Sequence, residues 1–358
     1  MTHRIAVLPG DGIGEEVMAQ ALRVLEAVGK KFGSEFSFTK GYVGGAGYDK
    51  YGAHFPDETK RICQESDAIL FGSVGGPVSE MHLPKWKNCE ANSILSIRKT
   101  FHFHANFRPV RVYPELLDIS PLKPEIIRRG IDLLFVRELV GDIYFGEHKT
   151  FERGGERVAT DMAEYTEAQI KAVAHTAFEA ARKRRKKVTS IDKANVLDTS
   201  KLWRLVVREV AADYPDVELG EMLVDNCAMQ LIIDPSQFDV VLTSNMFGDI
   251  LSDAGAVLPG SLGLLASASV NKDGFGLYEP PGGSAPDLAG KGVANPIAQI
   301  LSAAMMLRFS FNMQREADAI ESAVQSALSG GCRTGDIAQK GDAVLGTAQM
   351  TDAILSYL

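Results

Sequence analysis

Short apolar runs alternate with helical stretches along most of this chain, and this alternation limits its possible folds more than any other feature. Between the first two runs, apolar residues recur at close to the helical period from Ile13 to Phe32. Such strand and helix alternation predicts an α/β fold with a largely parallel sheet, and 358 residues suffice for roughly two domains. Buried strands are expected at Ile5–Leu8, Ala68–Phe71, Ile131–Val136, Val188–Ile191 and Val240–Leu242, and C-terminal helices at Ile297–Phe311 and Ala317–Leu328.

The charge balance limits the possible partners. The net charge of −8 argues against nucleic acid, because proteins that neutralise phosphates normally carry a basic surplus. The basic run Arg182–Lys187 follows an alanine-rich helical stretch, and cations are typical of a solvated helix end. No apolar run approaches the ~20 residues of a membrane span. We therefore expect no nucleic-acid partner and no membrane partner.

The cysteines and the N-terminus indicate the cytoplasm. Four cysteines are scattered, with no CxxC pair and no Cys/His cluster, which predicts reduced thiols rather than disulfides or a zinc site. The first residues lead from a short apolar burst directly into a turn, as expected for a strand rather than a signal peptide. The cysteines are Cys63, Cys89, Cys227 and Cys332.

Several expected strands end in polar residues that can carry chemistry. Arg137 and Glu138 follow one strand, Asp192 and Lys193 a second, and Asn245 lies just beyond a third. Ligands of open α/β sheets gather at the carboxyl ends of the strands. By contrast, the glycines from Gly10 to Gly14 have the spacing GxGxG, and we interpret them as a tight turn into a helix rather than as a dinucleotide-binding loop.

Two aspartates one helical turn apart indicate a metal site. Asp249 and Asp253 share one face of the expected helix, so their like charges must be solvated or share a cation. Their apolar neighbours between Ile250 and Leu262 are expected to be buried, which makes unpaired carboxylates costly. Oxygen ligands without a nearby Cys or His favour Mg²⁺ or Mn²⁺. On spacing alone, a solvated acidic face remains an equal alternative.

Arginines and two further side chains could complete a site for an acidic substrate. Arg98, Arg108 and Arg137 lie among apolar residues or at a strand end, and planar guanidinium groups bind carboxylates bidentately. Lys193 at a strand end could act as a base if its pKa is lowered, and Tyr144 follows Arg137 in the same segment. Taken singly, each arginine is more typical of a structural ion pair, Lys193 of a surface lysine and Tyr144 of a core tyrosine.

Taken together, these segments resemble the isocitrate/isopropylmalate family of β-decarboxylating dehydrogenases, with the bacterial isopropylmalate branch nearest. The similarity runs from the turn at Leu8–Gly14 to Thr334–Asp336, almost the whole chain. It implies a two-domain fold with a mixed, largely parallel sheet and no usual Rossmann domain, divided into a cofactor-side domain of residues 1–103 and 260–358 and a dimerisation, metal and substrate domain of residues 104–259. The other matching segments are Phe71–Pro77, Val136–Leu139, Ile143–Gly146, Thr189–Val196, Asn245–Asp253, Pro259–Leu264 and Gly282–Asp287.

The resemblance implies a role for each candidate residue. The three arginines would hold substrate carboxylates, and Lys193 and Tyr144 would be the general base and the acid that protonates the enol. The active sites would be shared within a homodimer, because Lys193 and Asp225 would come from the second subunit. Asp249 and Asp253, with that Asp225, would hold Mg²⁺ or Mn²⁺, and Asp225 would also contact the substrate. The apolar stretch Ile250–Leu265 also favours a dimer, since pairing would bury it.

The cofactor implied by the resemblance is NAD. Asp287 would accept hydrogen bonds from the ribose hydroxyls and repel the 2′-phosphate of NADP. Gly282 stands where many relatives have histidine, and Asp142 where the family often has glycine. The expected cofactor residues are Pro77, Glu90, Glu279, Gly283, Ser284, Ala285, Asp287 and Asn295.

The side chains of Ile94 and Leu95, one turn before Arg98, favour an apolar substrate group. Burying three carbons there contributes ~2 kcal/mol, which suits an isopropyl group and disfavours the third carboxylate of isocitrate. The implied reaction is NAD-dependent oxidation and decarboxylation of 3-isopropylmalate to 2-oxo-4-methylpentanoate, a step of leucine biosynthesis. A D-malate or tartrate dehydrogenase and a non-catalytic regulatory subunit are the alternatives.

Overall fold

The computed structural model describes residues 2–358, which form two compact units. The first unit comprises residues 2–101, 113–119 and 259–358, and the second comprises residues 102–112 and 120–258. Both units are discontinuous in sequence. The chain leaves the first unit after residue 101, returns to it briefly at 113–119, and returns to it again at 259 after completing the second unit. The division expected from the sequence had its boundaries at 103/104 and 259/260 and no such return.

The first unit contains a mixed sheet in the order β2-β1-β3-β12-β11. All neighbouring pairs are parallel except β11 and β12, which are antiparallel. The buried run that predicted the first strand forms the middle of β1, whose last six residues are all buried. The strands are β1 (Thr2–Gly10), β2 (Glu35–Lys40), β3 (Ala68–Ser73), β11 (Ser267–Val270) and β12 (Gly276–Glu279), with a separate short pair β13 (Arg333–Thr334) and β14 (Val344–Leu345).

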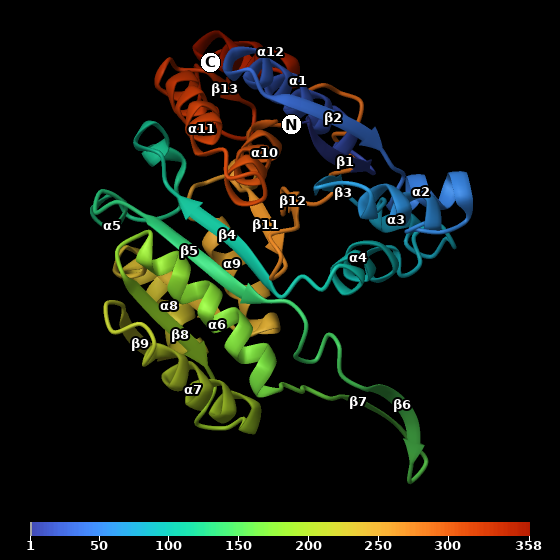
Figure 1. Ribbon diagram of the computed structural model, residues 1–358, viewed down its shortest axis with the longest axis vertical. Coiled ribbons are helices and arrows are strands. Elements are labelled where there is room, and N and C mark those ends of the chain that lie inside the picture. Colours follow the sequence, from blue (N-terminus) through green and yellow to red (C-terminus); the bar gives the residue numbers. More distant parts are fainter. Residues whose placement is uncertain (1) are drawn as a thin grey trace. The chain divides into compact units, whose positions relative to one another are not determined.

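Helices α1 and α10 pack on this sheet, and α11 and α12 pack on those helices (Figure 1). The longest, α1, buries the residues spaced at the helical period and ends at Gly33 in left-handed backbone. As expected, α10 is buried nearly all round. The helices are α1 (Gly14–Phe32), α2 (Gly44–Tyr51), α3 (Asp57–Gln64), α4 (Ser96–Thr100), α10 (Ile297–Phe309), α11 (Gln314–Ser329) and α12 (Thr347–Tyr357), with the π-helix η2 (Ala91–Leu95) and the 3₁₀ helices η1 (Val78–Glu80), η3 (Pro114–Ile119) and η5 (Leu262–Leu264).

The second unit repeats the strand and helix alternation around the sheet β4-β5-β10-β8-β9. Only β4 is antiparallel to its neighbour β5. Helices α6 and α7 pack on one face of these strands, and α8 and α9 pack together on the other (Figure 1). The elements are β4 (Ala105–Arg111), α5 (Pro124–Ile127), β5 (Asp132–Glu138), α6 (Glu167–Arg182), β8 (Lys187–Asp192), α7 (Asp198–Ala211), β9 (Glu218–Leu223), α8 (Val224–Ile233), η4 (Pro235–Gln237), β10 (Val240–Thr243) and α9 (Asn245–Ala256).

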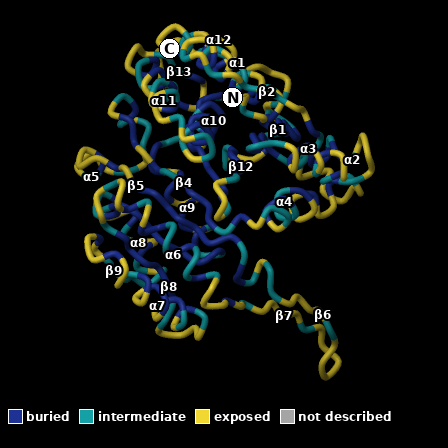
Figure 2. Tube along the Cα trace, in the orientation of Figure 1, coloured by how far each residue is buried: buried dark blue, intermediate teal, exposed yellow. Residues whose placement is uncertain are grey.

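One hairpin of the second unit extends away from its sheet. Strands β6 (His148–Arg153) and β7 (Glu156–Asp161) pair with each other, and their residues are almost all exposed (Figure 2). An isolated two-stranded hairpin is marginally stable in water, so a further surface to cover it is expected. No helix within residues 2–358 has the length and apolar character needed to cross a bilayer.

The predicted fold class is confirmed, since both units combine helices with a mixed, mainly parallel sheet. One local expectation is wrong: Ile250, Val257 and Leu262, expected to be buried, are 61%, 52% and 50% exposed in the single chain. The basic run after α6 is mainly exposed, as expected, and Arg184 within it also lies 2.8 Å from the carboxylate of the buried Asp239, just before β10.

Gly12 has a packing role that a side chain would destroy. Its backbone is left-handed (φ +59°), and a Cβ atom there would lie 1.9 Å from the carbonyl oxygen of Ser284. Gly12→Ala is expected to lower the free energy of unfolding by about 3 kcal/mol, because backbone strain of ~1–2 kcal/mol adds to overpacking of ~1–3 kcal/mol. Gly33→Ala is the matched control, since Gly33 has φ +76° but no atom within 4 Å of its Cβ position, and strain alone should cost ~1 kcal/mol. Urea denaturation measures both; equal losses would contradict the packing role.

Candidate active site

The polar residues of the second unit gather where three of its strands end. The register places Thr243 of β10 opposite Arg137 of β5 on one side and Ile191 of β8 on the other. The ends of these parallel strands therefore lie at one edge of the sheet, as the sequence led us to expect. Helix α9 begins at Asn245, immediately after β10, and carries two acidic residues from this edge.

Asp249 is the centre of the site in the second unit. One carboxylate oxygen forms an ion pair with Arg137 and lies 3.4 Å from Nη2 of Arg108. The other oxygen accepts a hydrogen bond of 3.0 Å from the hydroxyl of Tyr144. Asn245 fixes the Arg137 guanidinium, which donates to its Oδ1 from Nε at 3.0 Å and Nη2 at 2.8 Å. Three of the predicted site residues thus meet at one carboxylate.

Asp253 lies on the same side of α9 as Asp249, as the spacing predicted. The carboxylate of Asp253 lies 2.7 Å from Nη1 of Arg108, so one guanidinium contacts both aspartates. Arg108 is held by Oδ1 of Asn106 at 2.9 Å. The two carboxylates differ in exposure, at 33% for Asp249 and 68% for Asp253. This arrangement presents a pair of hard oxygen ligands at the open side of the helix.

The absence of a side chain at Gly248 lets Arg137 approach the helix. A Cβ atom at position 248 would lie 2.8 Å from Cβ of Arg137 and 2.3 Å from Oγ1 of Thr243. Any larger residue would push Arg137 away from Asn245 and Asp249. The glycine that precedes Asp249 in the motif is therefore required by the close contact of the helix with β5.

Tyr144 keeps its proton in this environment. Burial raises the pKa of its hydroxyl, and the nearby Asp249 carboxylate raises it further by its charge and by accepting the hydrogen bond. The side chain is still 37% exposed, so it can reach a bound molecule. A protonated hydroxyl at the edge of a charged site can serve as a proton donor.

Lys193 and Asp225 form a second, separate pair. Nζ of Lys193, just after β8, lies 2.5 Å from Oδ1 of Asp225 in the first turn of α8. This hydrogen bond from Lys193 lowers the pKa of the Asp225 carboxyl, which is exposed to solvent. Among residues 2–358, no three or more His, Cys, Asp or Glu side chains are grouped so that they could hold a metal ion. One chain therefore brings two of the three expected metal ligands together, but not the third.

Arg98 belongs to the first unit, where it is buried beside Glu279. Its Nη2 lies 3.1 Å from Oε1 of Glu279, and the two side chains are 9% and 11% exposed. Nε of Arg98 is buried and has no hydrogen-bond partner within the described residues. Ile94 and Leu95 lie one turn earlier, in the π-helix η2, a distortion that is frequent at functional sites. The predicted arginine set is thus divided, with Arg108 and Arg137 together and Arg98 in the other unit.

The segment expected to bind the cofactor follows β12 in the first unit. Its backbone is left-handed at Gly283 (φ +70°) and Ala285 (φ +38°), and Asp287 is exposed. The turn at Gly12 packs on it, since Ile13 N–H donates to the Ser284 carbonyl at 2.8 Å. Asn295 donates to Asp336 at 3.0 Å. Pro77 is half-buried and precedes η1, and Glu90 is exposed at the start of η2.

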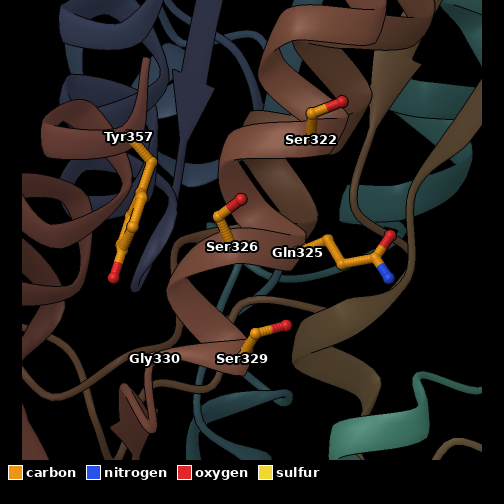
Figure 3. Close-up of a pocket in the computed structure, with 6 residues that line it drawn as sticks. All are labelled: Ser322, Gln325, Ser326, Ser329, Gly330 and Tyr357. Atoms are coloured by element: carbon orange, nitrogen blue, oxygen red, sulfur yellow. The ribbon is translucent and has the colours of Figure 1, made fainter.

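A separate cavity of about 580 Å³ lies beside α11 and α12 (Figure 3). Hydroxyl groups of serines on one side of α11 face it, and Tyr357 of α12 flanks it (Figure 3). Its lining has no carboxylate and no arginine, so it offers none of the chemistry found around Asp249. The lining residues are Ser322, Gln325, Ser326, Ser329, Gly330 and Tyr357.

Three residues that support this site had no predicted supporting role. Glu138, Asp142 and Tyr165 are buried polar residues close to the start of α9. Glu138 was visible as a charge at the end of an apolar run, and Asp142 as a departure from glycine. Tyr165 gave no signal, because its neighbours in the sequence are exposed and irregular.

Comparisons with known proteins agree with the expected family. A family model described as isocitrate/isopropylmalate dehydrogenase matches residues 4–354. A 3-isopropylmalate dehydrogenase from Geobacter metallireducens is 56% identical, over 99% of this chain and 99% of the relative. One from Yersinia pestis is also 56% identical, over 100% and 98%.

Solved structures show the same fold. The isocitrate dehydrogenase from Methylococcus capsulatus has a TM-score of 0.87 at 35% identity and covers 99% of both chains. A β-decarboxylating dehydrogenase from Thermococcus kodakarensis has a TM-score of 0.78 at 34% identity, over 99% of this chain and 96% of the other. The chain belongs to the isocitrate/isopropylmalate dehydrogenase family.

Proposed function

We propose that this chain catalyses the NAD-dependent oxidation and decarboxylation of 3-isopropylmalate to 2-oxo-4-methylpentanoate, a step of leucine biosynthesis. The observation that carries the proposal is the Asp249 carboxylate, which contacts Arg137, Arg108 and the Tyr144 hydroxyl and shares its helix face with Asp253. Relatives that are 56% identical over almost the entire chain carry the name 3-isopropylmalate dehydrogenase.

The substrate is a dicarboxylate with an apolar branch. Arg108 and Arg137 at the α9 site and Arg98 with its unpartnered Nε offer guanidinium donors for carboxylates. Ile94 and Leu95 are half-buried in η2 and would contact the isopropyl group. Their apolar side chains disfavour a third carboxylate at that position.

The acidic residues of α9 fit a divalent metal. Asp249 and Asp253 would hold Mg²⁺ or Mn²⁺, since carboxylate oxygens without nearby sulfur or imidazole are the ligands these ions prefer. A bound divalent ion lowers the pKa of a coordinated hydroxyl and stabilises negative charge that develops beside it. Asp225 of the partner subunit would supply the third carboxylate, which agrees with the lack of a three-ligand group in the described part of one chain.

Two side chains would move the protons. Lys193 would take the proton of the substrate hydroxyl while hydride leaves the carbon that bears this hydroxyl. Its short contact with Asp225 keeps Nζ near a proposed metal ligand, so both would reach the substrate together. After CO₂ leaves, Tyr144 would donate its proton to carbon. The raised pKa of its hydroxyl keeps that proton available at neutral pH.

NAD, bound by the first unit, would accept the hydride. The loop from Gly283 to Asp287 leaves space at its glycine, because no atom lies within 4 Å of a Cβ at Gly283. The exposed Asp287 carboxylate can accept from ribose hydroxyls and would repel a 2′-phosphate. Pro77, Glu90, Glu279, Ser284, Ala285 and Asn295 are the other proposed cofactor residues.

We infer that two copies of the chain form a homodimer with shared sites. Helices α8 and α9, which contact each other, and Val257 just after α9 expose large apolar side chains. Water-exposed surfaces of this kind mark interfaces. The exposed β6–β7 hairpin supplies two further unpaired strand edges. The apolar residues are Met229, Ile232, Ile233, Ile250 and Val257. The cytoplasm suits the enzyme, since all four cysteines are free thiols.

An assay of NAD reduction with 3-isopropylmalate, with and without Mn²⁺, tests this function. We expect turnover that EDTA abolishes and added Mn²⁺ restores. The same assay with D-malate, D-tartrate and isocitrate measures specificity as kcat/KM. A preference for D-malate would replace the proposed substrate, and turnover that survives EDTA would exclude the metal.

A further inference from the structure

Asp142 occupies a backbone conformation that favours glycine. Its φ is +70°, and its side chain lies in the interior, with the residue only 7% exposed. A left-handed conformation costs ~1–2 kcal/mol for a residue with a Cβ, and burial of a carboxylate adds to this cost unless it is hydrogen-bonded. The residue therefore needs a compensating interaction that glycine could not make.

That interaction joins the Tyr144 loop to the start of helix α9. Oδ2 of Asp142 accepts a hydrogen bond of 3.1 Å from the backbone N–H of Met246, in the first turn of α9. Oδ1 accepts one of 2.9 Å from the backbone N–H of Ile143. A carboxylate at a helix N-terminus binds free N–H groups and is stabilised by the helix dipole. One side chain thus fixes both the loop and the helix.

Tyr165 also links the Tyr144 loop to the start of helix α9. Its hydroxyl accepts a 2.9 Å hydrogen bond from the backbone N–H of Asn245 and lies 2.9 Å from Oε2 of Glu138 and 3.4 Å from Oδ2 of Asp142. Glu138 also accepts the N–H groups of the loop residues Val140 and Gly141. Burial raises the pKa of Glu138 to about 7, which eases the approach of two carboxyl groups to one hydroxyl.

These hydrogen bonds set the distance between the Tyr144 hydroxyl and the Asp249 carboxylate. Tyr144 lies two residues after Asp142, and Asp249 lies one turn after the α9 residues that Asp142 and Tyr165 hold. Their 3.0 Å hydrogen bond is therefore anchored at both ends by Asp142. We propose that Asp142 is a positioning residue that aligns Tyr144 for proton donation. This inference rests on the role proposed above for Tyr144.

A double-mutant cycle between Asp142→Gly and Tyr144→Phe tests the proposal. Glycine accepts the backbone conformation, so D142G should fold while the link to α9 is lost. A displacement of ~1 Å costs up to ~10²-fold in rate, so we expect kcat of D142G to fall roughly 10- to 100-fold, with KM for substrate and NAD changed less than about 3-fold. In the Y144F background, D142G should lower kcat less than about 2-fold, because residues that act as a unit are not additive.

Two further variants separate alignment from stability. Asp142→Asn tolerates left-handed backbone and keeps one oxygen acceptor for the Met246 N–H, while its NH₂ group replaces the acceptor at Ile143, so it should recover part of the kcat that D142G loses. Asp239→Asn is the matched control, since Asp239 is 1% exposed and accepts a 2.8 Å hydrogen bond from the backbone N–H of Arg185, far from Tyr144 in the sequence. It should lower Tm and leave kcat unchanged.

The outcomes are distinguishable. A D142G loss of the same size in wild type and in Y144F would overturn the role of Asp142 while the proposed function stands. Wild-type kcat in D142G would do the same. If Y144F itself turns over at the wild-type rate, Tyr144 is not the acid, and both the role of Tyr144 and this inference fail. If D142G does not fold, D142N replaces it in the cycle. The loss of kcat is then compared in the wild-type and Y144F backgrounds, and the expected loss is smaller.

Discussion

Asp249→Asn is expected to reduce kcat/KM for 3-isopropylmalate with Mn²⁺ by about 10³-fold. The carboxylate accepts from Arg137 and Tyr144 and lies near Arg108, whereas an amide offers one oxygen and turns its NH₂ group toward one of these donors. The substitution also removes the negative charge that would hold the metal. Loss of several kcal/mol of metal-derived stabilisation corresponds to ~10³-fold in rate.

Thermal unfolding separates this loss from a general loss of stability. A ligand that binds only the folded state raises Tm, so Mn²⁺ should raise Tm of the wild type and leave that of D249N unchanged. Asp318→Asn is a suitable control, because Asp318 is an exposed ion-pair partner of Arg308 in the first unit. It should keep both the activity and the Mn²⁺-dependent shift. Retention of Mn²⁺-dependent activity by D249N would exclude Asp249 as a metal ligand.

Local pattern was sufficient for much of the fold. Each of the five expected strands lies within or overlaps a strand of the structure, because a short apolar run between turns is buried wherever the sheet forms. Asp249 and Asp253 share a helix face for the same local reason, since four residues make about one helical turn. The sequence could also predict that polar residues after parallel strands share one edge, because parallel strands end on the same side.

Features that depend on distant pairing could not be read in this way. The return of residues 113–119 to the first unit follows from packing across more than a hundred residues. The hydroxyl of Tyr165 meets Glu138 27 residues away, and neither position has a local pattern that predicts the contact. Ile250 and Val257 were expected to be buried because hydropathy does not distinguish a core residue from an apolar residue at the surface.

Mixing two inactive variants is expected to restore activity if the sites are shared. In the proposed dimer, each site takes Asp249 and Tyr144 from one chain and Lys193 and Asp225 from the partner. A hybrid of one Lys193→Met chain and one Asp249→Asn chain then has one site with all residues intact and one that lacks both. Equal mixing with random pairing gives half hybrids, each with one working site, and therefore about a quarter of the wild-type activity.

The separation of Lys193 and Asp225 from the α9 carboxylates makes this test decisive. Because no three-ligand group exists among residues 2–358, a complete metal site within one chain would require the pair at Lys193 to move. The two variants must be unfolded and refolded together, and a mixture combined without refolding is the control that should stay inactive. If co-refolded chains of confirmed hybrid composition remain inactive, each chain supplies its own lysine and aspartates, and the shared site is wrong.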